Sequence, residues 1–255
     1  MPVITRQAQA FYLGSAQHLA AVGVNFLLRG TAQIPLLLED VILTSNFGFG
    51  SVNTITLAGQ SMMASDQGMP VQAFAPLAQL EGYRSLSVPI NTNQVYEMGG
   101  TLLAPAQDIG MQVSTSPIAP QQYRPTSELG GALNYCFGVA GTTAANLPAA
   151  VTTVFTATCL RDCLLGRLVV VNADGAVVPD DDINVTSILV EGIELLSSQA
   201  GVDVVNIGAL SAACTDLSGL QMNYPISANG QVRISIANAN VAIGTIGIGI
   251  FCLPA

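Results

Sequence analysis

Lysine and tryptophan are absent from the sequence, and His18 is its single histidine. Charged residues make up 9% of the chain, whereas a typical soluble domain has about 25%. General acid–base and nucleophilic catalysis at neutral pH usually recruit His, Lys or an activated Cys. Nucleotide-binding, serine-hydrolase and zinc-protease motifs do not occur in the sequence either. The sequence therefore predicts a protein that is not an enzyme.

Positive charge is scarce and scattered. The sequence contains seven arginines and sixteen aspartate or glutamate residues, so its formal net charge is −9. Neutralisation of phosphates dominates nucleic-acid affinity, so we expect no direct contact with nucleic acid. A surface with so few charges would make a free monomer poorly soluble. We therefore expect copies of the same chain to cover much of that surface.

All five cysteines lie in the second half of the chain: Cys136, Cys159, Cys163, Cys214 and Cys252. An odd number confined to one half does not suit a disulfide framework. The Cys159–Cys163 spacing also lacks the second pair that a zinc site needs. We expect buried free thiols, as in a protein made in a reducing cytoplasm.

No segment has the length and composition of a transmembrane helix. The longest nearly apolar stretch, residues 241–253, has 13 residues and three glycines, whereas a spanning helix needs about 20 residues. Residues 1–19 mix polar and apolar side chains. We expect them to be a retained N-terminal arm with amphipathic character rather than a secretory signal.

Two stretches of the sequence match each other. Residues 54–77 align without a gap on residues 187–210, and residues 94–117 align on residues 231–254, so the offset changes from 133 to 137. The identical pairs of the first block are Ile55/Ile188, Gly59/Gly192, Ser65/Ser198, Gly68/Gly201, Val71/Val204 and Leu77/Leu210. This period is too long for a solenoid, and it indicates a duplicated domain of about 100 residues.

Period-two alternation dominates both halves and indicates β-strands. In residues 231–237, valine or isoleucine occupies every second position. Residues 245–251 place isoleucines on the inner face and Gly247 and Gly249 on the outer face. A strand with glycine on its outer face lets another backbone or a neighbouring subunit approach closely.

We predict an all-β fold of two tandem antiparallel domains related by duplication. Turn signals recur about every 8 to 12 residues, which is typical of a β-sandwich or jelly roll. The predicted parts are an N-terminal arm at residues 1–19, a first β-sandwich or jelly-roll domain at 20–117, a linker at 118–149 and a second such domain at 150–255.

The densest acidic cluster comprises Asp180, Asp181 and Asp182, with Asp174 across a predicted hairpin turn. Ca²⁺ takes about six to eight oxygen ligands, so these four aspartates are the candidate metal ligands. Their spacing does not match an EF-hand, and an acidic turn of this kind can equally be solvated. If the ion binds, we expect it at a subunit contact. We expect no other cofactor.

Two fused antiparallel β-domains of about 100 residues, with low charge, a proline-rich connector and an N-terminal arm, resemble the double jelly-roll capsid proteins of icosahedral viruses, including membrane-containing phages. The resemblance rests on the repeat and covers residues 20–255. In that family two jelly rolls stand side by side, and three chains form a pseudo-hexameric capsomer. The N-terminal segment of those proteins often faces an internal membrane.

The resemblance implies a viral or phage major capsid protein that self-assembles through trimers into an icosahedral shell. Its location would be the virion, after synthesis in the host cytoplasm. Its partners would be itself, other virion proteins and, through the N-terminal arm, an internal membrane. A secreted or cell-surface adhesin or lectin-like protein built of two β-sandwiches is the alternative, and a β-rich hydrolase is the third.

Overall fold

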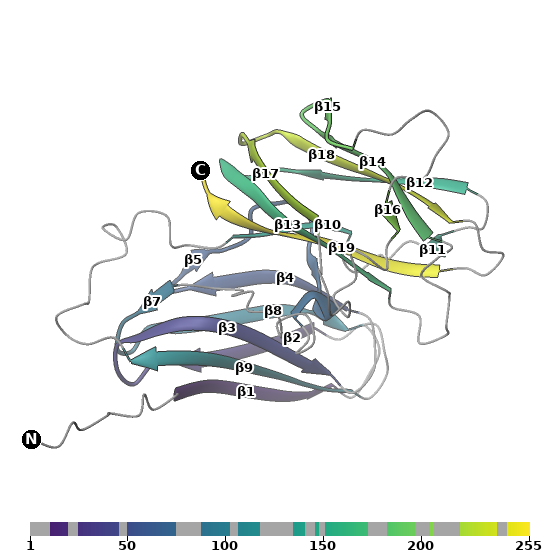
Figure 1. Ribbon diagram of the computed structural model, residues 1–255. Helices are drawn as coiled ribbons and strands as arrows, with labels where there is room; N and C mark the ends of the chain where they lie inside the picture. The colour runs from purple at the N-terminus through teal and green to yellow at the C-terminus, as the bar shows by residue number, and fades with distance from the viewer. Residues whose placement is uncertain are drawn as a thin grey trace, which may run out of the picture.

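The computed structural model describes residues 11–19, 25–45, 50–74, 88–102, 107–117, 135–140, 146–147, 151–172, 183–196, 205–206, 220–238 and 244–255. Within these ranges the chain forms nineteen β-strands and one short 3-10 helix. The strands of the second half lie above those of the first in Figure 1, and the C-terminus lies near the boundary between the two sets.

The first half forms two sheets, and the residues between them build one hydrophobic core. One sheet has the strand order β1-β9-β3-β7. The other has the order β2-β8-β4-β5, with β6 also paired to β4. The elements are β1 (Phe11–Leu19), β2 (Asn25–Thr31), β3 (Leu36–Ser45), β4 (Gly50–Leu57), β5 (Gln60–Ser61), β6 (Met69–Pro70), the 3-10 helix η1 (Val71–Phe74), β7 (Val88–Ile90), β8 (Val95–Leu102) and β9 (Gln107–Pro117).

The second half repeats this arrangement. One sheet has the order β10-β19-β13-β17, with β11 on β19, and the other has the order β12-β18-β14-β15, with β16 on β14. The elements are β10 (Tyr135–Ala140), β11 (Asn146–Leu147), β12 (Val151–Thr158), β13 (Cys163–Asn172), β14 (Ile183–Val190), β15 (Ile193–Glu194), β16 (Val205–Asn206), β17 (Leu220–Ile226), β18 (Gln231–Asn238) and β19 (Gly244–Pro254). The predicted alternation in β18 is confirmed, because Val232, Ile234 and Ile236 are fully buried.

The connection order identifies each domain as a jelly roll. In the first domain β1, β3, β7 and β9 share one sheet, while β2, β4, β6 and β8 share the other, and all their ladders are antiparallel. The described strands of the second domain follow the same order. Two antiparallel sheets connected in this way form the double-sheet jelly roll. The predicted all-β fold of two antiparallel domains is therefore confirmed.

The duplication extends to details of the backbone. Ala58 and Gly59 have φ angles of 51° and 82°, and Glu191 and Gly192 have φ angles of 50° and 83°. Two successive residues with positive φ form the tight hairpin turn that favours glycine, which explains the Gly59/Gly192 identity. Equivalent strands also carry equivalent bulges, which lie between Val52 and Thr54, Val185 and Ser187, Leu38 and Asp40, and Leu165 and Arg167.

The structure corrects the sequence alignment by one residue. The alignment paired Gln94 with Gln231, but Val95 begins β8 as Gln231 begins β18. The offset of 137 begins instead at β9 and β19, because the loop before β19 is one residue longer than the loop before β9. A slip of one residue in a strand turns every side chain to the other face, so the correction decides which side chains are equivalent.

Two predicted boundaries are also corrected. Residues 11–19, expected in the arm, form β1, which pairs along its whole length with β9. Residues 135–140 and 146–147, expected in the linker, form β10 and β11, and both pair with β19. Without these strands, the backbone groups along one edge of β9 and of β19 would lack partners, so tertiary pairing overrides local composition.

Candidate functional site

The predicted calcium ligands Asp174, Asp180, Asp181 and Asp182 fall between β13 and β14, outside the described residues, so the calcium site stays a prediction. Within the described ranges, no group of three or more His, Cys, Asp or Glu side chains could hold a metal ion. No helix in that part of the chain is long and apolar enough to cross a membrane.

The two domains are joined through residues 62–69 of the first domain, which we call the docking segment. The amide of Cys136 in β10 donates to the carbonyl of Met62 at 2.9 Å, and the amide of Ala64 donates to the carbonyl of Cys136 at 2.8 Å. The amide of Leu160 donates to the carbonyl of Ala64 at 2.8 Å. The docking segment therefore lies along the start of the second domain as an added, irregular strand.

Asp66 strengthens this contact with its side chain. Its carboxylate oxygen Oδ1 accepts a hydrogen bond from the amide of Thr158 at 2.8 Å. Its own amide donates to the carbonyl of Thr158 at 3.1 Å. One residue of the first domain thus satisfies both backbone groups at the end of β12, which fixes the docking segment against that strand.

Glycines let the domains approach closely. Gly138 in β10 pairs across the ladder with Gly249 in β19. A Cβ atom on Gly138 would overlap the carbonyl of Gly68, and one on Gly249 would lie 2.6 Å from Sδ of Met69. The expectation that glycine on the outer face of β19 admits a close approach is confirmed at Gly249, where the approaching atoms belong to the Met69 side chain of the first domain. Backbone approaches backbone at Gly138 in the neighbouring strand β10.

Apolar side chains continue the junction beyond the docking segment. The rings of Phe74 in η1 and Phe251 in β19 meet edge to face, with centroids 5.7 Å apart. Val169 in β13 is 1% exposed. Both Val169 and Phe251 belong to the hydrophobic core of the first domain, although their strands belong to the second. The outer face of the β10-β19-β13-β17 sheet, which we call the junction face, is therefore buried against the first domain.

The first domain has an equivalent surface, the outer face of its β1-β9-β3-β7 sheet, which we call the matching face. The strand registers place Ile42 where the second domain has Val169, and Gln112 where it has Gly249. Ile42 is partly exposed and Gln112 is exposed, whereas their two counterparts are buried. The same sheet face is thus covered in one domain and open to solvent in the other.

The sequence identified the glycine face but not its partner. Gly68 of the docking segment has an identical counterpart, Gly201, so the repeat marks it as part of the shared shape and gives no sign of a junction. Asp66 is aligned with Gln199, and this difference between the repeats is not enough to predict that Asp66 contacts the second domain. Gly138 is the residue from which the junction could have been predicted. The sequence analysis assigned it to the linker, whereas in the structure it lies in β10 opposite Gly249.

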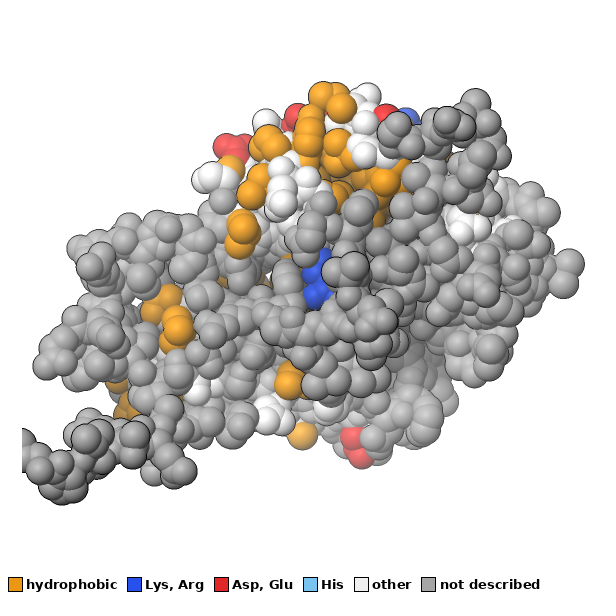
Figure 2. Space-filling view, in the orientation of Figure 1, with side chains coloured by type: hydrophobic (Ala, Val, Ile, Leu, Met, Phe, Trp, Pro, Cys, Tyr) orange, Lys and Arg blue, Asp and Glu red, His pale blue; other side chains and the backbone are white. Residues whose placement is uncertain are grey.

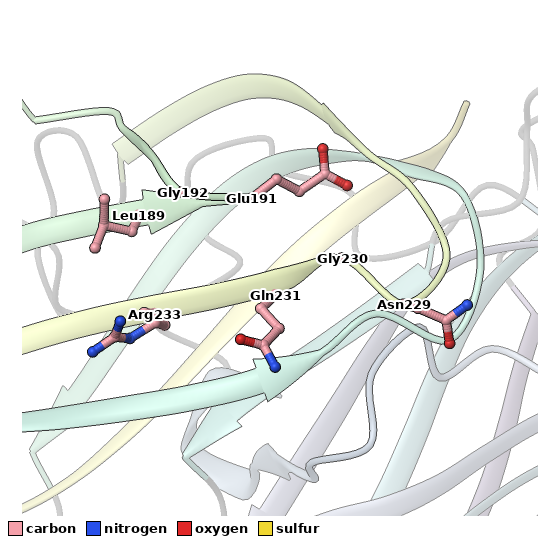
Figure 3. Close-up of a pocket in the computed structure, with 7 residues that line it drawn as sticks. All are labelled: Leu189, Glu191, Gly192, Asn229, Gly230, Gln231 and Arg233. Atoms are coloured by element: carbon pink, nitrogen blue, oxygen red, sulfur yellow. The ribbon is translucent and has the colours of Figure 1, made fainter.

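A pocket of about 360 Å³ lies at one end of the second domain (Figure 3). Its lining comprises Leu189, Glu191, Gly192, Asn229, Gly230, Gln231 and Arg233. The Glu191 carboxylate accepts a hydrogen bond from the amide of Ser227 at 3.1 Å and points away from the Arg233 guanidinium. The pocket therefore combines polar and apolar surface, and its acidic and basic side chains point apart.

The first domain does not repeat the chemistry of this pocket. Glu97 occupies the position of Arg233, and it forms an ion pair with Arg29 in which Nη2 and Oε2 lie 2.6 Å apart. Ala58 occupies the position of Glu191. The two jelly rolls therefore share a backbone arrangement, while the side chains on their surfaces differ.

Several large apolar side chains are exposed on the surface of both domains. Figure 2 shows apolar side chains gathered at the top of the view, over the second domain. Leu27 in β2 and Val154 in β12 occupy equivalent positions and are 50% and 47% exposed. Leu160 and Ile193, in the second domain, are 56% and 54% exposed.

No protein-family model and no curated protein matches the sequence. Among solved structures, the chain is similar to VP54 of PBCV-1, determined as a crystal structure and fitted into a cryo-EM reconstruction of the virophage Sputnik. That match has 11% identity and a TM-score of 0.37, and covers 99% of this chain and 95% of the other. The STIV major capsid protein matches with 11% identity and a TM-score of 0.39, over 94% and 96% of the two chains.

A crystal structure of BuGH86 in complex with neoagarooctaose matches 97% of this chain but 34% of its own length, with 11% identity and a TM-score of 0.24. The first two matches cover nearly the full length of both chains, whereas the third covers about a third of the other chain.

Proposed function

We propose that this protein is the major capsid protein of a virus or phage and that it assembles through trimers into an icosahedral shell. The observation that carries the proposal is that two equivalent sheet faces differ in their exposure to solvent. The junction face is buried inside the chain, while the matching face is open to solvent. A duplicated domain that covers one face and leaves the other open has the form of a unit that continues into a neighbouring copy.

The geometry of such a contact is heterologous, because it joins two different surfaces. The docking segment of the first domain contacts the junction face of the second domain in the same chain. By the same geometry, the second domain of one chain would contact the matching face of the next chain. A head-to-tail contact of this kind closes into a ring if its rotation closes. Three chains would then form a ring of six jelly rolls.

The composition supports a shell protein rather than a soluble monomer. Charged residues are few, no lysine occurs, and large apolar side chains are exposed on both domains. Jelly rolls of this type are the building domains of many viral capsids. We place the protein in the virion after synthesis in the host cytoplasm, with other virion proteins as partners. Its N-terminal residues face an internal membrane, and it makes no contact with nucleic acid.

The test is the oligomeric state of the purified chain, measured by size exclusion with light scattering. We expect a trimer of about 79 kDa, three times the chain mass of 26.3 kDa, and larger shells in negative-stain images. Ile42→Glu would place a charge on the matching face and dissociate the trimer. Ile193→Glu, at an exposed position outside both faces, is the matched control: it should leave the trimer intact, whatever its effect on contacts between trimers in the shell.

Two outcomes would contradict the proposal. One is a clean monomer at every protein concentration and salt level, with Ca²⁺ and with a chelator. The other is a trimer that survives Ile42→Glu. The chelator arm also tests the predicted calcium site, since loss of assembly without Ca²⁺ would be restored by adding the ion back.

The lectin-like alternative is favoured by one observation, the polar pocket lined by Glu191, Gln231 and Arg233. Jelly rolls also form lectin domains, and sugars bind to shallow polar pockets through side chains of these kinds. A glycan-binding array with the wild-type chain and with Arg233→Ala would test it. Binding by a stable monomer that Arg233→Ala abolishes would favour the alternative over the capsid proposal.

A further inference from the structure

Two buried cysteines lie close together in the turn that connects β12 to β13. The Sγ atoms of Cys159 and Cys163 are 3.9 Å apart, and both side chains are fully buried. Cys159 Sγ also donates to the carbonyl of Arg161 at 2.8 Å, which fixes its position within the turn. A disulfide bond is about 2.05 Å long, so bond formation requires the two side chains to rotate toward each other.

The surroundings give the two thiols different roles. A hydrogen bond from the Cys252 thiol lowers the pKa of Cys163, the Cys159 thiol and the positive charge of Arg161 lower it further, and burial opposes them. Burial raises the pKa of Cys159. The thiolate is the reactive form of cysteine, so Cys163 is the attacking sulfur and Cys159 is the resolving one.

We propose that Cys159 and Cys163 form an intramolecular disulfide by exchange with a small-molecule disulfide of the glutathione class. Cys163 attacks one sulfur of the oxidant, which forms a mixed disulfide and releases one thiolate. Cys159 then loses its proton and attacks the Cys163 sulfur, which releases the second thiolate. The two cysteines lose two protons and two electrons in total, and the oxidant takes them up to become two thiols.

The position of this disulfide connects it to the junction between the domains. The amide of Leu160, the next residue after Cys159, donates to the carbonyl of Ala64, and Thr158 on the other side is held by Asp66. A bond from Cys159 to Cys163 would close a loop around Leu160, Arg161 and Asp162 and restrict the turn that docks onto the first domain. Oxidation would therefore slow the separation of the two domains.

Access to the sulfurs requires a small opening of the turn. Leu160 is 56% exposed and Asp162 is exposed, so the turn lies at the surface although its sulfurs point inward. Turns of this kind open locally far more often than the whole protein unfolds. We expect the exchange to be slow in native protein and faster at low, non-denaturing concentrations of urea.

The experiment is incubation of the reduced chain with oxidised glutathione, followed by trypsin digestion and mass spectrometry without reduction. Trypsin cleaves after Arg161, between the two cysteines, so the disulfide links two peptides that separate in the reduced sample. We expect this linked pair and a fall from five titratable thiols to three under denaturing conditions. A Cys163–Cys252 link, or five thiols remaining after equilibration, would overturn the proposal.

Single variants assign the roles of the two sulfurs. Cys159→Ser should trap glutathione on Cys163, because the resolving thiol is gone, while Cys163→Ser should leave Cys159 without an adduct. Cys136→Ser is the matched control, since Cys136 is also buried but should not change the linked pair. An adduct on Cys159 in Cys163→Ser would contradict the assignment. If a variant does not fold, fragment-ion spectra of the linked pair from the wild-type chain decide the proposal, because they distinguish Cys159 from Cys136 on the same tryptic peptide.

Discussion

Gly138 in the second domain forms an antiparallel bridge with Gln67 in the first, and the carbonyl of Gly68 fills the space where a side chain at position 138 would begin. Backbone therefore meets backbone across the boundary between the domains. A contact of this kind depends on the absence of a side chain rather than on the presence of one, and it makes the junction sensitive to the smallest substitution.

Gly138→Ala is expected to destabilise the protein by about 1–3 kcal/mol, the usual range for overpacking a close contact. Gly110→Ala is the matched control on the matching face, because a Cβ there would meet Thr44 Oγ1 at 3.0 Å, a side chain that can rotate away. Urea unfolding followed by fluorescence measures both free energies. Equal effects of the two substitutions would contradict the account of the junction.

Gly59→Ala and Gly192→Ala should each cost about 1–2 kcal/mol, the strain of a left-handed residue with a Cβ. A Cβ at either site would have no atom within 4 Å, so the cost is conformational and should be equal in the two domains. Scanning calorimetry measures it. Asparagine tolerates this conformation, so the two Gly→Asn variants should lose clearly less stability than the alanine variants. Unequal losses at the two turns would show that they are not structural equivalents.

Asp66→Ala should weaken the junction by about 1–2 kcal/mol, since it removes the acceptor for the Thr158 amide. Asp66→Asn keeps an oxygen at the same position and should lose less than half as much. The readout is the urea midpoint together with the rate of limited proteolysis. An Asn variant as unstable as the Ala variant would mean that the negative charge, rather than the hydrogen bond, supports the contact.

Acid should weaken the second domain through Glu194. Burial raises the pKa of this carboxylate, but hydrogen bonds from the Ser187 hydroxyl and from the amides of Ile188 and Leu196 outweigh it and hold the pKa below its ordinary value of 4.5. A carboxylate whose pKa is lower in the folded state than in the unfolded chain stabilises the folded state at pH values above the unfolded-chain pKa. This contribution is lost as the pH falls through the folded-state pKa.

Glu194→Gln should therefore lower the free energy of unfolding at pH 7. Below pH ~4 the difference in unfolding free energy between this variant and the wild type should become smaller. The equivalent residue in the first domain is Ser61, whose hydroxyl oxygen accepts from the amide of Met63 at 3.2 Å and does not titrate in this range. Ser61→Ala, the control, should shift the urea midpoint equally at both pH values. A constant difference between wild type and Glu194→Gln from pH 7 to pH 3 would contradict the prediction.

Much of the fold was predictable because the relevant signals are local. The alternation of Val232, Ile234 and Ile236 predicts a half-buried strand, and Gly59 and Gly192 predict equivalent turns. The prediction was wrong where a segment acquires structure from a distant partner. Residues 11–19 form a strand because β9 has an edge to fill, and no pattern within those residues reveals that edge.

The sequence by itself determined that the chain is all-β, duplicated, poor in charge and lacking the usual catalytic side chains, since composition and periodicity are properties of the chain alone. The tertiary structure alone decided that each half is a jelly roll, because the connection order depends on pairings between distant strands such as β3 and β9. It also decided that Gly138 meets Gln67 and that Cys159 lies beside Cys163. These contacts depend on how one domain packs against the other and on how a turn folds, and side-chain identity does not specify either without the backbone that positions them.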